Sequence, residues 1–82
     1  MSNVGDYVTE QYRQGSRYEG YKLNGQKHGF GKFYYQDGGL YEGNWQFNKM
    51  EGLGKLYYQS DRIAYDGEWH NDQFSGKGTL YN

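Results

Sequence analysis

The residue types that could support catalysis or metal binding are few in this 82-residue chain, and they do not cluster. His28 and His70 lie far apart, and neither has a second histidine at ligand spacing, whereas a metal site needs three or four ligands. The lack of cysteine excludes disulfides, cysteine-based zinc sites and a cysteine nucleophile. None of the serines lies in a G-x-S-x-G motif. We therefore expect no catalytic residues, no metal and no cofactor.

The glycines also fail to form a phosphate-binding loop. Gly29-Phe30-Gly31 does not continue as G-x-G-x-x-G, because Tyr34 occupies the last position, and no Walker motif is present. Carboxylates such as Glu42 and Glu51 are expected on opposite sides of a turn, without a pocket that would exclude water from them. The chemistry that remains belongs to the aromatic rings, which comprise 11 Tyr, 4 Phe and 2 Trp.

Composition favours a thin, aromatic fold over a conventional core. Leu, Ile, Val and Phe together fall below roughly 20% of the chain, a level that alone would suggest disorder. Aromatic residues make up 21%, however, glycines number 14, and the net charge is only −1. That combination argues against disorder, and it also argues against a helical bundle, an α/β enzyme or a two-layer sandwich.

Charge and targeting signals narrow the function classes further. The nine basic and ten acidic residues are scattered, so no basic patch predicts binding to nucleic acid or anionic lipid. The N-terminal segment has no apolar core of a signal peptide, and no apolar run approaches the roughly 18 residues of a membrane span. We therefore expect a cytoplasmic protein that is not secreted.

A repeat of 23 to 24 residues organises the chain. Its leading Tyr-acid-Gly triplets are Tyr18-Glu19-Gly20, Tyr41-Glu42-Gly43 and Tyr65-Asp66-Gly67. Eleven residues after each leading tyrosine stands a Gly-x-Gly, at Gly29–Gly31, Gly52–Gly54 and Gly76–Gly78. Trp45 and Trp69 each follow their leading tyrosine by four residues. Tyr12-Arg-Gln-Gly15 matches the tail of a unit, which indicates a partial strand ahead of the first repeat.

These residues resemble the MORN (membrane occupation and recognition nexus) repeat family, whose unit reads roughly YxGxWxxGxxxGxG. The resemblance covers Tyr18 to Asn82. It divides the chain into an N-terminal lead-in (1–17), two full repeats (18–40 and 41–64) and a truncated third repeat (65–82). The resemblance implies an all-β fold, a single-layer twisted antiparallel meander of consecutive β-hairpins with about six to seven strands.

The sequence departs from the family pattern at a few positions. Lys22 replaces the aromatic residue of the first repeat, and Asn48 and Asp72 stand where Gly25 keeps the family glycine. Asn and Asp tolerate positive φ best after glycine, so we expect the turns to survive. The second repeat has one extra residue near Arg62–Ala64, which predicts a bulge or a longer turn.

Period-two alternation and turn dipeptides predict the strands. We expect them near 17–23, 29–35, 40–46, 52–58, 64–70 and 76–81, with a further strand near 7–12.

One register satisfies both faces of the expected sheet. It places Gly43 opposite Gly54, Trp45 opposite Gly52, Tyr41 opposite Leu56, Glu42 opposite Lys55, Glu19 opposite Lys32 and Asp66 opposite Thr79. Large rings would then cover bare glycine backbone, and opposite charges would pair across strands.

One face of this sheet is expected to carry the aromatic side chains and to curl into a groove. Its candidate partner-binding residues are Tyr18, Phe33, Tyr35, Tyr41, Trp45, Leu56, Tyr58, Tyr65, Trp69 and Leu80. The structural glycines beneath them are Gly20, Gly29, Gly31, Gly43, Gly52, Gly54, Gly67, Gly76 and Gly78. Two interpretations stay open. The rings are either only the core of the sheet or a core that also binds a helix or extended peptide.

The resemblance implies a non-catalytic interaction or scaffold module, of a kind found in cytoskeletal and ciliary assemblies. Its aromatic groove would dock other proteins, with Tyr41, Trp45, Tyr58, Tyr65 and Trp69 as anchors. Two alternatives are a peripheral membrane or phosphoinositide-binding module, which the scattered charge supports weakly, and a regulatory segment of a larger enzyme. Stacking on nucleic acid is disfavoured because basic partner residues are lacking.

The ends of the expected sheet raise two further hypotheses. The last strand has no atypical capping unit after it, so either the chain is part of a longer array or this edge pairs with a partner or a second copy. At the other end, Val4, Tyr7, Val8 and Tyr12 provide apolar side chains that could fold over the groove.

Overall fold

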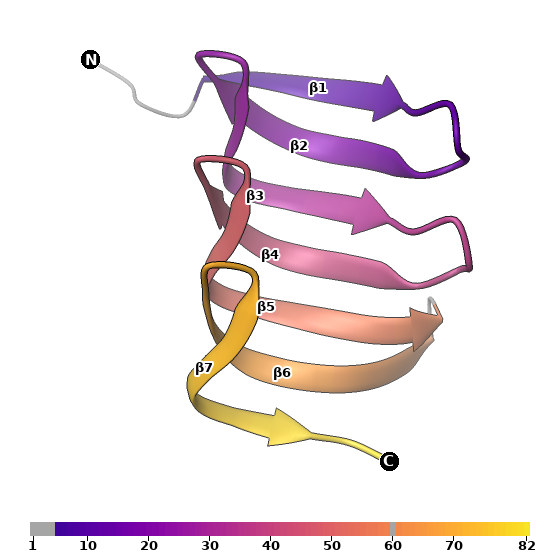
Figure 1. The fold of residues 1–82 in the computed structure, drawn as a ribbon, viewed down its shortest axis with the longest axis vertical. Helices are drawn as coiled ribbons and strands as arrows, with labels where there is room; N and C mark the ends of the chain where they lie inside the picture. Colours follow the sequence, from indigo (N-terminus) through magenta and orange to yellow (C-terminus); the bar gives the residue numbers. More distant parts are fainter. Residues whose placement is uncertain (1–4, 60) are drawn as a thin grey trace.

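The chain folds into one seven-stranded antiparallel sheet in which spatial order follows sequence order (Figure 1). We analysed a computed structural model that describes residues 5–59 and 61–82, so residues 1–4 of the lead-in and residue 60 of the second repeat lie outside the described part. The strands are β1 (Asp6–Gln11), β2 (Arg17–Leu23), β3 (Gln26–Tyr34), β4 (Leu40–Gln46), β5 (Lys49–Gln59), β6 (Arg62–His70) and β7 (Gln73–Leu80). The expected all-β, single-layer meander is confirmed.

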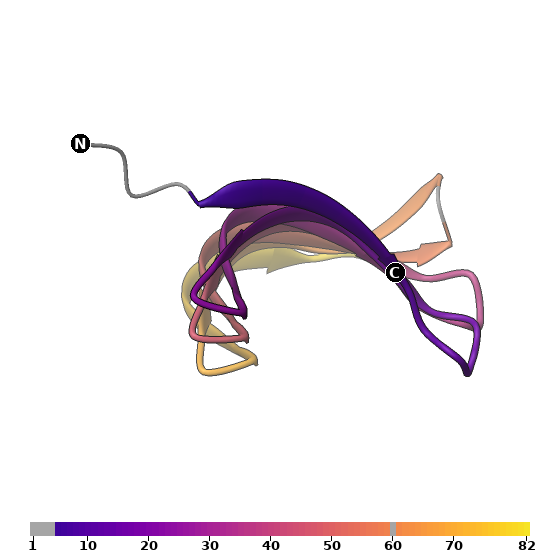
Figure 2. The ribbon, with the colours of Figure 1, turned by 90° about the horizontal axis from the view of Figure 1, so that it is seen from above.

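The sheet is arched, with a concave and a convex face. Seen from above, the layer bends into a trough. The tips of the β2–β3, β4–β5 and β6–β7 hairpins turn toward the same side (Figure 2). The principal extents of the molecule are 40 × 30 × 17 Å, as expected of a thin, curved layer. Curvature of this kind follows from a high glycine content, because glycine permits sharp local twist.

Two-residue turns join the strands within each repeat. Both central residues have positive φ in all three turns, namely Asn24 and Gly25, Phe47 and Asn48, and Asn71 and Asp72. Such turns match the right-handed twist of the flanking strands. The expectation that Asn48 and Asp72 would replace a turn glycine is therefore confirmed, with φ values of 66° and 68°.

The central register agrees with the prediction over most of its length. The residues paired as expected are Gly43 with Gly54, Tyr41 with Leu56, Glu42 with Lys55, Glu19 with Lys32 and Asp66 with Thr79. The prediction that Trp45 faces Gly52 is wrong, because Trp45 lies opposite Met50. The stretch of β5 between the Met50 and Gly54 pairs bulges out by two residues relative to β4, and Gly52 accommodates the bulge with a φ of 82°.

Equivalent bulges in all three hairpins explain why three strands begin earlier than predicted. β3, β5 and β7 start at Gln26, Lys49 and Gln73, three residues before the Gly-x-Gly motifs, because pairing resumes beyond the bulge and continues to the turn. A second irregularity, between Leu56 and Gln59, lies where the extra residue of the second repeat predicted one.

The N-terminal segment extends the sheet and does not cover the groove along β1. β1 pairs in antiparallel fashion with β2 over its whole length, from Asp6 opposite Lys22 to Gln11 opposite Arg17. Val8 of this strand packs against the edge of the aromatic cluster, and Val4 lies outside the described residues. β1 is therefore an end strand of the array.

Candidate functional site

Five aromatic side chains form a buried ladder along the concave face. Tyr18, Tyr41, Trp45, Tyr65 and Trp69 are each at most 7% exposed, although the sheet has only one layer. They alternate in space, and Tyr41 meets Trp45 and Trp69 edge to face, each at a centroid distance of 5.1 Å. Edge-to-face contacts of this kind are favourable because the positive edge of one ring meets the negative face of the next.

Glycines make this burial geometrically feasible. The ring of Tyr41 lies on the backbone of Gly54, and a Cβ atom at Gly54 would overlap it. The Tyr41 hydroxyl donates a hydrogen bond of 2.8 Å to the carbonyl of Asn44 in the bulge of its own hairpin. Tyr18 and Tyr65 repeat both features, over Gly31 and Gly78, and donate to the carbonyls of Tyr21 and Glu68. Each tyrosine thus packs its ring and satisfies its polar end at once.

The indoles complete the ladder from the opposite side of each glycine strand. Trp45 Nε1 donates to the carbonyl of Gly31 at 3.2 Å, and Trp69 Nε1 donates to the carbonyl of Gly54 at 3.0 Å. Both Gly31 and Gly54 are buried. Every inner Gly-x-Gly strand therefore receives a tyrosine from the strand before it and a tryptophan from the strand after it.

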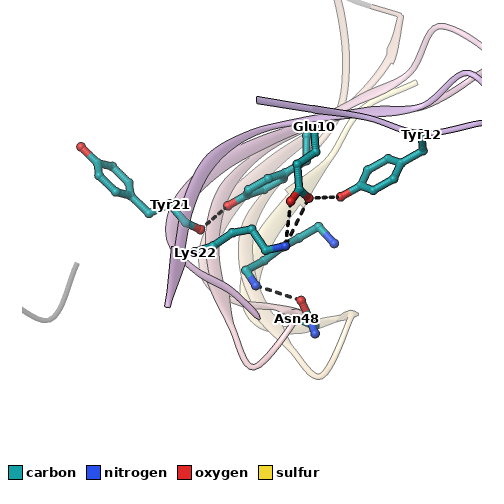
Figure 3. A network of polar contacts seen from close by, with 7 residues as sticks. Glu10, Tyr12, Tyr21, Lys22 and Asn48 are labelled. Carbon is teal, nitrogen blue, oxygen red and sulfur yellow. Dashed lines mark hydrogen bonds and ion pairs between the residues drawn. The ribbon is translucent and has the colours of Figure 1, made fainter. Parts of the chain in front are cut away.

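The first repeat replaces the indole with a polar network. Lys22 Nζ lies 3.0 Å from Glu10 Oε2, and the Tyr12 hydroxyl donates a 2.8 Å bond to Glu10 Oε1 (Figure 3). The hydrogen bond from Tyr12, followed by that from Lys22, lowers the pKa of Glu10. Burial, followed by the bond to Glu10, raises the pKa of Tyr12 to about 12. The sequence signal for this network was Lys22 at the tryptophan position.

Lys27 adds a cation to the same end of the concave face. Its ammonium lies between 5.4 and 5.8 Å from the centroids of four rings, those of Tyr12, Tyr18, Phe33 and Trp45. Burial, followed by repulsion from Lys22, lowers the pKa of Lys27. Contacts between an ammonium and aromatic faces offset part of that desolvation.

The turns of the second and third repeats also clamp the strand of the repeat before them. Asn48 Oδ1 accepts a 2.8 Å bond from the Lys27 amide, and the Asn48 amide donates 3.1 Å to the Lys27 carbonyl. Asp72 makes the same pair of bonds, at the same lengths, with Met50. Sequence reasoning identified these residues only as turn formers and missed the clamp. Their signal was a carboxamide or carboxylate where the family has glycine.

The predicted partner-binding residues divide into three groups by position. Tyr18, Tyr41, Trp45, Tyr65 and Trp69 form the buried ladder, and Phe33, Tyr35 and Leu56 pack against it half-buried. Tyr58 and Leu80 are 54% and 69% exposed and lie outside this cluster. Val8, Tyr12 and Met50, which were not predicted as partner-binding residues, pack against the ladder as well.

The convex face carries both charged and exposed apolar side chains around a shallow hollow. The hollow has a volume of about 410 Å³ and is lined by Phe30, Glu42, Gly43, Asn44, Leu53, Gly54, Lys55 and Asp66. Glu42 contacts Lys32 at 3.6 Å, whereas the predicted partner Lys55 lies opposite Glu42 on the other neighbouring strand. Phe30 and Leu53 are 46% and 64% exposed on this face.

Two classes of site find no support in residues 5–59 and 61–82. No three His, Asp or Glu side chains of this part of the chain lie close enough together to hold a metal ion. No helix in the same residues is both long and apolar enough to span a membrane.

The repeat geometry now allows comparison with known proteins. The MORN repeat signature matches residues 18–40, 41–61 and 65–81, which together make up most of the chain. The chain belongs to the MORN repeat family. A comparison with curated proteins gives no match, so the assignment rests on the repeats themselves. MORN repeats are non-enzymatic modules that generally interact with proteins or membranes.

Proposed function

We propose that this MORN protein is a non-catalytic interaction module whose concave face docks a helical or extended segment of a partner protein. The observation that supports this most directly is a row of apolar side chains that stay half-exposed beside the buried ladder. This concave row consists of Val8, Tyr12, Phe33, Tyr35, Met50 and Leu56. Within this row Phe33 contacts both Tyr12 and Tyr35. A partly exposed apolar patch commonly marks a protein interface.

The two open interpretations of the aromatic face then apply to different side chains. The ladder residues are too buried to be reached by a partner, so we assign them to the core. The concave row would supply the partner contacts, with Phe33, Tyr35 and Leu56 as anchors. Partly exposed aromatic and aliphatic side chains around a packed centre fit the usual organisation of an interface.

Leu56 and Leu53 offer a matched test because both lie on β5, but Leu56 packs against the ladder and Leu53 lines the hollow of the convex face. We would select peptides that bind the 82-residue chain from a displayed library of helical and extended sequences. Leu56→Lys should weaken binding by about 30-fold, the effect of losing an interface anchor. Leu53→Lys should bind like the unmodified chain, with far-ultraviolet circular dichroism confirming both folds. If both variants bind the peptides as tightly as the unmodified chain, or if both lose binding equally, the proposal is contradicted.

Membrane binding is the alternative within the same family. The charges of the concave face argue against it, because Lys22 is paired with Glu10 and Lys27 lies among aromatic rings. Lipid-binding patches usually present roughly four to eight free basic side chains. Co-sedimentation tests membrane binding, with vesicles containing phosphatidylserine or phosphoinositides at low and high salt. Strong, salt-sensitive binding would overturn the proposed function.

We further propose, from the family resemblance alone, that this module works in the cytoplasm within a cytoskeletal or ciliary scaffold. A regulatory segment of a larger enzyme is the further alternative that the resemblance suggests. Imaging of the tagged protein beside markers of the cytoskeleton and cilium tests the location. A diffuse signal in the presence of both structures would count against it.

A further inference from the structure

The first repeat has two lysines on the concave face where the other repeats have apolar pairs. In the second and third repeats a tryptophan lies opposite Met50 or Phe74. In the first repeat Lys22 and Lys27 lie directly opposite each other on β2 and β3. Like charges in this arrangement repel each other, so the pair attracts carboxylates to this corner of the sheet.

Only one carboxylate of the chain forms an ion pair with these two cations. Glu10 lies 3.0 Å from Lys22 Nζ (Figure 3). Asp72 attracts Lys27 through space, but its carboxylate is bonded to a backbone amide of β5. Among the residues that the structure describes, no carboxylate forms an ion pair with Lys27, and the other five residues of the chain have no acidic side chain. Glu10 and the two lysines therefore leave one positive charge uncompensated.

This charge lies on Lys27, which is half-buried among aromatic rings. Its ammonium is 5.8 Å from the ring centroid of Tyr12 and 5.5 Å from that of Phe33. Burial is the main cause that lowers the pKa of Lys27, so water solvates its charge incompletely. The aromatic faces replace only part of that hydration. A carboxylate would therefore bind this ammonium more tightly than it would bind an exposed lysine.

We propose that the partner segment bound by the concave row carries an Asp or Glu whose carboxylate binds the Lys27 ammonium. An apolar side chain beside this carboxylate would pack on the half-buried rings of Tyr12 and Phe33, whose centroids are 6.0 Å apart and whose planes differ by 27°. The inference rests on the proposed function, because it specifies the chemistry of the partner that the concave row docks.

A carboxylate suits this corner better than a phosphate group does. Phosphate carries nearly two negative charges at neutral pH and is usually bound by clusters of basic side chains. Here Lys27 is the one uncompensated cation, and Glu10 is close enough to act on it electrostatically. The second charge of a phosphate would therefore meet Glu10 without a cation of its own. An acidic segment fits the charge balance, whereas a phosphorylated segment does not.

A small probe tests the cation without a partner protein. Titration of the 82-residue chain with 3-phenylpropionate should shift the side-chain resonances of Lys27 in ¹H–¹³C spectra. The neutral 3-phenylpropionamide should bind about tenfold more weakly, the effect of losing one charge-assisted hydrogen bond. Equal affinity of the acid and the amide would overturn the inference.

Lys27→Met removes the charge and keeps the packing, because methionine occupies the equivalent position at Met50. The bonds to Asn48 involve only the backbone of residue 27, so they are retained. In this variant the acid and the amide should bind equally. Lys55→Met is the matched control, since it removes an exposed lysine of the convex face, and it should keep the preference for the acid. Circular dichroism checks both folds, and Lys27→Gln replaces Lys27→Met if that variant unfolds.

Selection from the displayed peptide library tests whether a partner segment uses this site. Peptides selected on the unmodified chain should share an acidic residue beside an apolar one. Peptides selected on Lys27→Met should keep the apolar residue and lack the acid. Replacing the acid of a selected peptide by its amide should weaken binding to the unmodified chain about tenfold and leave binding to Lys27→Met unchanged. Phosphoserine in place of the acid should also weaken binding.

The outcomes separate this inference from the proposed function. Peptides that require Leu56 but share no acidic residue, or whose acid is equally favoured by Lys27→Met, would overturn the inference and leave the proposed function in place. Tighter binding of the phosphoserine peptide would overturn the choice of a carboxylate. If no peptide binds while 3-phenylpropionate still requires Lys27, the carboxylate site is supported and the proposed function is overturned.

Discussion

Tyr41 shows how a single residue can replace a conventional core. Its ring covers glycine backbone on the next strand, its edges meet two indoles, and its hydroxyl satisfies the Asn44 carbonyl. A leucine at this position would bury a similar face but would leave that carbonyl without its donor. The combination explains why this chain needs few aliphatic residues. Stability also depends on glycine beneath the ring, because any side chain there would displace the ring.

Gly54→Ala tests that dependence. The added methyl group would overlap the Tyr41 ring and should cost about 3 kcal/mol of unfolding free energy, at the upper end of overpacking effects. Gly25→Ala is the matched control, because it also replaces a glycine but has open space around it. Its cost should be only the roughly 1 kcal/mol of a positive φ. Urea unfolding measures both, and equal losses would contradict the proposed role of the ring.

Alkaline pH should unfold the sheet through the same tyrosines. Burial raises the pKa of Tyr18 and Tyr41, and it raises that of Tyr12 to about 12. Because the folded pKa lies above the unfolded value of about 10, these groups contribute stability in full below pH 10 and lose it as the pH rises. Absorbance of tyrosinate at 295 nm and the circular dichroism of the sheet should change together above pH 10. Ionisation of all tyrosines with an intact sheet would refute this.

At the scale of the element, the hairpin is the repeating unit of the sheet, and it also bonds to the hairpin before it. Its two-residue turn, its bulge and its tyrosine belong to one hairpin, yet Asn48 and Asp72 reach back to the hairpin before. Neighbouring hairpins are thus linked both through the ladder and through their turns. The turn clamps align the hairpin tips, which lie in a row in Figure 2.

Replacing Asn48 isolates the turn clamp. Asn48→Gly keeps the positive φ but removes the acceptor for the Lys27 amide, whereas Asn48→Asp keeps both, as Asp72 does in the next turn. Hydrogen exchange of the Lys27 amide should therefore accelerate in the glycine variant only. The net value of such a bond, about 1 kcal/mol, corresponds to a several-fold change in rate. If both variants protect this amide equally, the clamp has no energetic role.

Across the whole molecule, the two ends of the sheet differ in kind. At the β1 end, Val8 and Glu10 take the places of a strand glycine and an apolar residue, and Lys22 replaces tryptophan. These changes form a closed polar network there. At the β7 end the Gly-x-Gly motif is kept, Thr79 stands where the inner strands have Lys32 and Lys55, and nearly every residue of the strand is exposed. The two edge strands of the described sheet therefore differ in their polar contacts and in their exposure.

Protection from hydrogen exchange should follow this polarity. Each strand of such an array is stabilised by its neighbours, and β7 has only β6. Amides bonded between β4 and β5 should exchange most slowly and those between β6 and β7 fastest, with β1–β2 between them because of its polar network. Native-state exchange in low urea measures the order. Uniform protection would show that the sheet opens as a single unit.

Much of this molecule could be predicted from the repeat, and what could not has a common cause. Alternation and the pairing of Gly43 with Gly54 predicted the strands, the faces and the central register. The bulge that moves Trp45 opposite Met50 was missed, because an extra pair of residues leaves the alternation of β4 itself unchanged. The Lys22–Glu10–Tyr12 network and the turn clamps join different hairpins, so a pattern read along one unit does not reveal them.

The equivalent docking of a tryptophan on a Gly-x-Gly in the two inner junctions has a consequence for the length of the molecule. Because β4 and β6 each dock on the preceding strand in the same way, a duplicate of residues 41–64 placed after Ala64 would meet the geometry it requires on both sides. Two added strands would lengthen the sheet by about 10 Å, at the usual spacing between strands. The number of repeats thus sets the distance between the first and the last strand of the sheet.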